Sequence, residues 1–129
     1  MTFINHETIL KRAFTIAFAC LFIGCRKDDS CEVDELFIKK FRTCINSIQQ
    51  SELQTRNVFI EEKVEAILFL NAVTGHESQV SNLHFAIYDS IDLLYQDLRI
   101  WQNWLEENKC LMTIARADST LDRYNRGVP

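Results

Sequence analysis

Glycine and proline are scarce in this chain, with three glycines and one proline among 129 residues. After residue 24 only Gly75, Gly127 and Pro129 remain. A fold of many strands needs such residues at its turns. Their scarcity therefore favours helices over a many-stranded sheet.

Motifs that carry chemistry are missing as well. The sequence has no glycine-rich loop that could bind phosphate, and no serine, threonine or cysteine lies in a nucleophile motif. His76 and His84 have no Cys-x-x-Cys or His-x-x-x-His spacing near them, which argues against a metal site. We therefore expect no enzymatic activity, no metal and no cofactor.

Positive charge is also limited, because 14 lysines and arginines stand against 18 aspartates and glutamates, for a net charge of −4. No basic run follows residue 30, so the drive to bind nucleic acid by neutralising phosphates is absent. The carboxylates Glu61, Glu62 and Glu65 lie at helical spacing beside Lys63. This spacing predicts a solvated helix face rather than an acidic site.

The first thirty residues carry the clearest signal that is present. Lys11 and Arg12 precede an apolar run over residues 13–23, which Gly24 and Cys25 follow. A basic segment, an apolar segment of about 7–15 residues and a small residue before the cut are typical of a secretory signal. The run is shorter than the about 20 residues of a membrane-spanning helix, and it has no polar face. We therefore predict a signal peptide, helical in its apolar part, at residues 1–24.

The end of this segment, Phe22-Ile23-Gly24-Cys25, resembles the lipobox of bacterial lipoproteins. The resemblance implies cleavage after Gly24, acylation of Cys25 with a diacylglycerol and a further acyl chain on the new amino terminus. Two or more acyl chains anchor a protein stably to a bilayer. The mature protein would then be attached to a membrane through Cys25.

The residues that follow, Cys25-Arg26-Lys27-Asp28-Asp29, are similar to the export signal of surface lipoproteins of the Bacteroidetes, a lysine followed by two acidic residues. That resemblance implies a domain on the outer membrane that faces outward from the cell. An ordinary charged lipoprotein linker is the alternative, and it would leave the domain facing the periplasm. In both interpretations residues 25–31 form a tether.

A small all-α bundle of about three helices is predicted for residues 32–110, a length that suits one domain. Apolar residues recur at steps of three and four over about 32–50, 57–74 and 90–108. Ser30 and Asp34 are suited to cap the first helix.

The ends of the other two helices also carry signals. Gly75 lies where the second helix needs a left-handed C-cap. Asp89 or Ser90 can cap the third helix.

Two segments outside these helices are less regular. Over residues 76–88 apolar and other side chains alternate, which indicates an extended segment, and a short helix fits nearly as well. Residues 111–129 are predicted to be a C-terminal tail, a loop with at most a short turn near residues 118–124.

A second resemblance covers residues 69–109. The string Phe69-Leu70-Asn71-Ala72-Val73-Thr74-Gly75, with Asp97, Trp101, Trp104 and Asn108 further on, is similar to a pattern in uncharacterised bacterial envelope proteins and some helical-repeat proteins. In that pattern an L-T-G helix end precedes a helix carrying D-x-x-x-W-x-x-W-x-x-x-N, and it implies no activity. Two tryptophans three residues apart widen the apolar face of a helix. Trp104 lies off the centre of the apolar stripe and is therefore a candidate contact with a partner.

The cysteines pose a separate question. Cys20 would leave with the signal and Cys25 would carry lipid, so Cys31, Cys44 and Cys110 remain. In an up-down-up bundle the ends of the first and third helices meet, which suggests a disulfide between Cys44 and Cys110 in an oxidising envelope. The alternative is three reduced cysteines, with Cys44 filling the core face of its helix.

Together these features predict an envelope lipoprotein that acts as a non-catalytic binding or accessory module. Its partners would be the membrane, through Cys25, and a protein whose identity the sequence does not give. The alternative is an inhibitor or immunity-type lipoprotein that blocks a partner enzyme, with an acidic face meeting a basic one.

Overall fold

The computed structural model of the protein describes residues 31–54 and 57–128. The described helices all lie in one compact unit, residues 32–129. The predicted signal peptide, the lipobox with Cys25 and all of the tether before residue 31 lie outside the described residues.

The described part of the chain is all-α, as predicted. Its helices are α2 (Glu35–Glu52), α3 (Ile60–Thr74), α4 (Ile91–Asn108) and α5 (Ile114–Asn125). No strand occurs in this part of the chain, and the β pairing among the described residues is limited to an isolated antiparallel bridge between Asn82 and Ile87. The three predicted helices correspond to α2, α3 and α4, each within three residues at either end.

Helix α2 begins where its capping residue predicts. The Asp34 carboxylate accepts hydrogen bonds from the backbone N–H groups of Leu36 at 3.0 Å and Phe37 at 3.1 Å. These two N–H groups have no partner inside the helix, so the cap satisfies them. Phe37 and Phe41 are fully buried on the face of α2 that points into the core.

The caps of the next two helices also match the sequence. Gly75 ends α3 in the left-handed conformation, with φ of 70°. This conformation costs a residue with a side chain about 1–2 kcal/mol, which explains the glycine. Ser90 caps α4 by accepting a hydrogen bond from the backbone N–H of Leu93.

The C-terminal segment differs from the prediction, because residues 114–125 form the regular helix α5 rather than a tail with a short turn. Thr113 caps α5, and Ala117 is fully buried against the rest of the domain. Ala117 is the only fully buried residue of α5, and most of the other residues of this helix are polar or charged. Its apolar residues Ile114, Ala117 and Leu121 nevertheless recur at steps of three and four, which is helical spacing. The helix packs on α3 and α2, and the helical domain therefore extends past residue 110.

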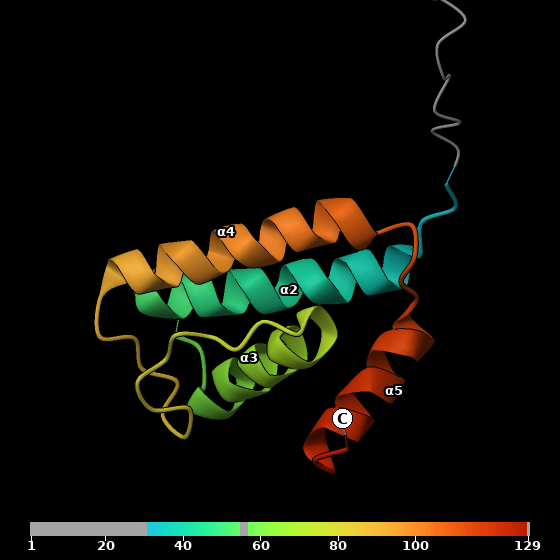
Figure 1. The fold of residues 1–129 in the computed structure, drawn as a ribbon. Coiled ribbons are helices and arrows are strands. Elements are labelled where there is room, and N and C mark those ends of the chain that lie inside the picture. Colours follow the sequence, from blue (N-terminus) through green and yellow to red (C-terminus); the bar gives the residue numbers. More distant parts are fainter. Residues whose placement is uncertain (1–30, 55–56, 129) are drawn as a thin grey trace, which may run out of the picture. The chain divides into compact units, whose positions relative to one another are not determined.

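The directions of the helices also differ from those in an up-down-up bundle. Figure 1 shows that α2 and α4 run antiparallel, with the end of α4 beside the start of α2. A hydrogen bond of 2.9 Å from the backbone N–H of Ile114 to Asp34 Oδ2 joins these two ends. The reason is the segment over residues 76–89, which returns along the domain without a helix and makes α4 run parallel to α3.

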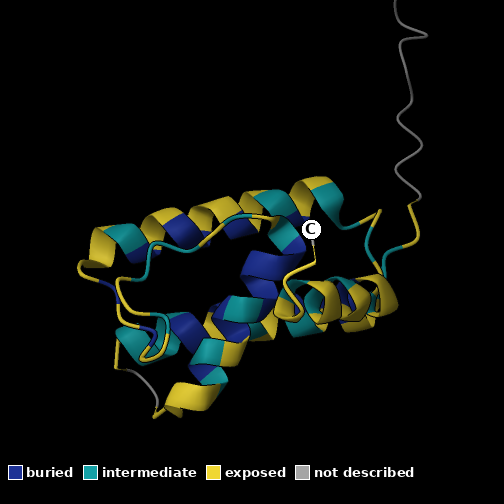
Figure 2. Cartoon of the chain, turned by 60° about the horizontal axis from the view of Figure 1, so that its bottom comes forward, coloured by how far each residue is buried: buried dark blue, intermediate teal, exposed yellow. Residues whose placement is uncertain are grey.

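The core lies where α2, α3 and α4 meet, and α5 covers one side of α3 (Figure 2). Helix α3 is enclosed on more than one side, so its buried residues are not confined to a single stripe. Its fully or almost fully buried side chains include Ala66, Ile67, Phe69, Leu70 and Asn71.

One charged residue of α3 is buried, in contrast to the predicted solvated face. The Lys63 ammonium group forms an ion pair with Glu52 of α2, and only 6% of Lys63 is exposed. Glu62 is half-buried and accepts a 2.8 Å hydrogen bond from the Ser47 hydroxyl group. Glu61 and Glu65 are exposed, as predicted. The polar side of α3 therefore helps to hold α3 against α2.

Asp34 caps α2 and also accepts a hydrogen bond from the backbone N–H group of Ile114. We therefore expect Asp34→Ala to lower the midpoint of thermal unfolding. These N–H donors, with Ile114 first, hold the pKa of the Asp34 carboxyl group below its ordinary value. The stabilisation is complete above that ordinary pKa, about 4, and is lost as the pH falls through the lowered pKa.

Circular dichroism melts at about pH 7 and about pH 2 measure this dependence, with the exposed Asp92→Ala as the matched control. The wild type should exceed Asp34→Ala at the higher pH, and the gap should shrink at the lower pH. Equal midpoints at the higher pH would contradict the role of Asp34.

Candidate functional site

The most polar cluster in the domain surrounds Asp97, a fully buried residue of α4. Its Oδ2 atom accepts hydrogen bonds from the backbone N–H of Gln79 at 2.7 Å and from the Tyr88 hydroxyl group at 2.9 Å. Its Oδ1 atom lies 2.8 Å from His76 Nε2 and accepts a weaker bond of 3.3 Å from Gln79 Nε2. A buried carboxylate is tolerated only when it is bonded in this way.

This cluster contains a histidine and an aspartate, but its geometry is that of a structural contact. The His76 ring has the fully buried Asp97 carboxylate as its hydrogen-bond partner. The ring also packs edge-on against Trp101, with 6.2 Å between the ring centres. Burial, and then the Asp97 carboxylate, raise the pKa of Tyr88, so its hydroxyl group stays protonated and donates. The cluster therefore holds the segment over residues 76–89 on α4.

A second buried polar residue holds the other side of the same segment. Asn71 of α3 accepts a 3.0 Å hydrogen bond from the backbone N–H of Ser78, and its amide group donates to Glu77 at 3.3 Å. The Tyr124 hydroxyl group of α5 donates to both carboxylate oxygens of Glu77, at 3.0 and 3.1 Å. Burial, and then Glu77, raise the pKa of Tyr124, which keeps this donor protonated. Residues 76–78 are thereby attached to α3 and α5.

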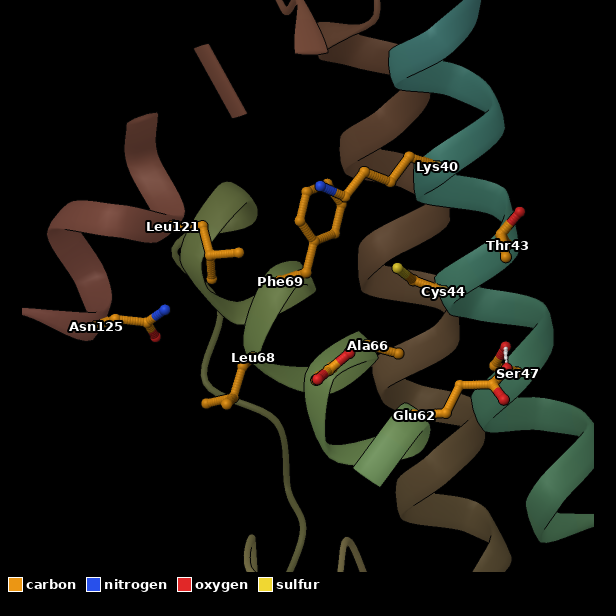
Figure 3. A pocket seen from close by; sticks show the side chains of 11 residues that line it. Lys40, Thr43, Cys44, Ser47, Glu62, Ala66, Leu68, Phe69, Leu121 and Asn125 are labelled. Atoms are coloured by element: carbon orange, nitrogen blue, oxygen red, sulfur yellow. Dashed lines mark hydrogen bonds between the residues drawn. The ribbon is translucent and has the colours of Figure 1, made fainter. Parts of the chain in front are cut away.

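A cleft of about 390 Å³ opens between α2, α3 and α5 (Figure 3). The Lys40 ammonium group at its rim lies 2.7 Å from Asp118 of α5 and 4.7 Å from the centre of the Phe69 ring. Leu121 and Asn125 line the side formed by α5, as Figure 3 shows. These contacts bind α5 to the domain.

Cys44 lies in this cleft. The predicted disulfide between Cys44 and Cys110 is wrong. Cys44 is a free thiol in the middle of α2, whereas Cys31 and Cys110 are each disulfide-bonded. Neither a bond between Cys44 and Cys110 nor a set of three reduced cysteines is correct. Because α4 runs antiparallel to α2, its end lies beside the start of α2 and not beside Cys44. Burial raises the pKa of the Cys44 thiol to about 11, which makes it a poor nucleophile.

Trp104, the predicted partner contact, packs within the domain. Its ring stacks on Phe41, with 5.7 Å between the ring centres and 8° between the ring planes, and the residue is half-buried. One face of the ring is thus occupied by the core. A partner contact of Trp104 stays a prediction, and other apolar side chains are more exposed.

The most exposed aromatic side chains gather at one end of the domain, here called the apolar end and defined by Phe59, Ile60, Phe85 and Ile87. Phe59 is 79% exposed and Phe85 is 51% exposed. A shallow groove of about 430 Å³ runs between the first turns of α3 and the turn at residues 82–87. Its lining consists of Ile60, Glu61, Val64, Glu65, His84 and Phe85.

The charge around the apolar end is of one sign. Residues 64–98 contain no lysine or arginine, and the Lys63 ammonium group is buried against Glu52. Arg56 lies outside the described residues. Exposed carboxylates flank the apolar side chains at Glu61, Glu65, Asp89 and Asp92. Among the described residues, the apolar end is therefore acidic.

Sequence reasoning did not identify this surface. Phe59 falls inside the helix predicted over about 57–74, and Phe85 falls in the alternating segment over 76–88, and neither pattern indicates that these side chains are exposed. A usable signal was present, because the long stretch without lysine or arginine is visible in the sequence. The sequence does not show that the start of α3 and the turn at residues 82–87 lie side by side.

Comparisons of the chain with protein-family models, with curated proteins and with solved structures found no match. Among residues 31–54 and 57–128, no helix has both the length and the apolar character needed to cross a bilayer. The same residues contain no group of three or more histidine, cysteine, aspartate or glutamate side chains placed to hold a metal ion.

Asp97→Ala should destabilise the domain by at least about 3 kcal/mol, because it leaves several buried donors without an acceptor. Tyr88→Phe, which removes one of these hydrogen bonds, should cost about 1 kcal/mol. Urea unfolding measures both free energies, and amide hydrogen exchange of Gln79 reports on the bonded N–H group. Tyr95→Phe, at an exposed tyrosine of the same helix, is the control that should change neither value. Unchanged exchange at Gln79 in Asp97→Ala would contradict the structural role of Asp97.

The cysteine assignment predicts the order of chemical labelling. Without reductant, iodoacetamide should modify Cys44 but neither Cys31 nor Cys110, and reduction should release both. Because the pKa of Cys44 is raised to about 11, its labelling near neutral pH should be at least about tenfold slower than that of free cysteine. Mass spectrometry of the peptides measures the labelling. Modification of Cys110 before reduction would contradict the assignment.

Proposed function

We propose that the protein is a bacterial envelope lipoprotein whose helical domain is a non-catalytic binding module. The observation that carries this proposal is the apolar end, where Phe59 and Phe85 expose aromatic surface to solvent. Exposed apolar surface with a polar rim is typical of sites where proteins interact. The buried polar side chains of Asp97 and Asn71, in contrast, hold the segment over residues 76–89 to the rest of the domain.

Anchoring through lipid at Cys25 is the second part of the proposal, and it rests on the sequence Phe22-Ile23-Gly24-Cys25. The domain begins at the start of α2, whereas the apolar end lies near the end of this helix. An α-helix rises about 1.5 Å per residue, so the 18 residues of α2 separate the two by about 27 Å. A tether at the first end leaves the second end accessible to a partner. We propose the outer membrane, with the domain facing outward, as the location.

The exposed carboxylates around the apolar end, Glu61, Glu65, Asp89 and Asp92, form an acidic rim. This rim supports one alternative, an inhibitor or immunity-type lipoprotein that blocks a partner enzyme. Glu61 and Glu65 beside the groove would complement a basic surface around an active site. An inhibitor forms a tight one-to-one complex with a single enzyme, whereas an accessory module co-purifies with other envelope components. Size-exclusion chromatography of the purified complex separates these two cases.

The anchoring proposal predicts that Cys25→Ala releases the protein from the membrane. We would express the wild type, Cys25→Ala and the matched control Cys20→Ala in a related bacterium. The wild type and Cys20→Ala should fractionate with the outer membrane, incorporate labelled palmitate and be cleaved by external protease. Cys25→Ala should lose the label and the membrane association. Identical fractionation of Cys25→Ala and the wild type would overturn the lipid anchor.

A further inference from the structure

Building on the proposed binding function, we propose that the apolar end binds a cationic amphipathic helix of a partner protein. Such a helix would place apolar anchors in the groove beside Phe59 and Phe85, and its lysines and arginines would meet the acidic rim. The proposal specifies the surface and the chemistry of the partner, which the proposed function leaves open.

The shape of the surface favours a helix over an extended strand. Addition of a strand requires an exposed row of unpaired backbone groups. In the turn at residues 82–87 the backbone N–H groups of Ala86 and Ile87 already donate to Leu83 and Asn82. What remains open is the groove between this turn and α3, lined by Ile60, Val64 and Phe85. Grooves of this kind bind helices through anchors spaced three, four and seven residues apart.

The backbone of the turn that carries Phe85 is held in place by contacts within the domain. Ala86 is fully buried with a left-handed φ of 50°, and the bridge between Asn82 and Ile87 closes the turn. Tyr88 is bonded to Asp97, which ties the end of the turn to α4. A backbone that is ordered in advance loses little conformational freedom on binding. The apolar end therefore behaves as a formed site.

Charge decides between the candidate occupants. Glu61 and Glu65 line the groove, and no exposed lysine or arginine lies among the described residues 57–98. A second copy of the chain would bring acidic rim against acidic rim, which opposes self-association. An anionic bilayer surface is likewise repelled by carboxylates. A helix rich in lysine and arginine is attracted, and its association is accelerated at low salt.

The test compares two designed peptides of about 18 residues, or about five helical turns. Both carry the same leucine stripe, flanked by lysine in one peptide and by glutamate in the other. Binding to the full chain, purified in a mild nonionic detergent, is measured by fluorescence anisotropy. The lysine peptide should bind at least about tenfold more tightly than the glutamate peptide. Its affinity should fall between about 50 and about 300 mM salt.

Variants then locate the binding. Phe59→Ala with Phe85→Ala should weaken binding of the lysine peptide at least about tenfold, and Glu61→Gln with Glu65→Gln should reduce the salt dependence. Leu111→Ala is the matched control, because Leu111 is 63% exposed outside the apolar end and should leave binding unchanged. The altered side chains are exposed, and unchanged circular dichroism melts establish that the variants are folded.

Several outcomes would overturn this inference. These are equal affinity for the two peptides, no binding of either peptide, equal losses in Leu111→Ala and the phenylalanine variants, or self-association through the apolar end. Preferential binding to anionic phosphatidylglycerol vesicles would also overturn it, in favour of a membrane surface. None of these results bears on membrane fractionation of Cys25→Ala, so failure of the partner assignment is distinguishable from failure of the lipid anchor.

Discussion

The buried carboxylate of Asp97 holds the long connection between α3 and α4. This connection runs back along the domain without a helix of its own, so its polar groups need partners in the interior. Asp97 bonds to Gln79 and Tyr88 and contacts His76, while Asn71 bonds to Ser78 on the other side. Because the connection returns in this way, α4 runs antiparallel to α2. The same bonds fix the turn that presents Phe85 at the apolar end.

The C-terminal helix α5 depends on a few polar contacts at its ends and along its length. Asp34 joins its first residue to the cap of α2, and Lys40 pairs with Asp118 one turn further on. Near the other end of α5, the Glu77 carboxylate accepts a hydrogen bond from the Tyr124 hydroxyl group. Exposed ion pairs are individually weak, so the burial of Ala117 and the packing on α3 are needed as well. Helix α5 thereby forms one side of the cleft that contains the free thiol of Cys44.

The domain separates its polar and apolar side chains by role. Polar residues that would draw attention as a catalytic group, such as His76 and Asp97, are used to position the backbone. The two most exposed aromatic residues, Phe59 and Phe85, lie outside the core at the apolar end. A packed interior of this kind keeps the backbone that carries Phe59 and Phe85 in a fixed arrangement, which supports the proposed binding function.

The sequence by itself determined the local structure: the all-α class, the three longer helices, the caps at Asp34, Gly75 and Ser90, and the buried stripe of α4. These follow from spacing and capping, which act between residues close together in the chain. Only the tertiary structure decided that residues 114–125 form α5, that Lys63 is buried and that Cys44 is a free thiol. It also decided that Phe59 and Phe85 share one end. Each of these depends on how separate segments of the chain pack on one another, as in the ion pair of Lys63 with Glu52, and the spacing of residues within one helix does not show such packing.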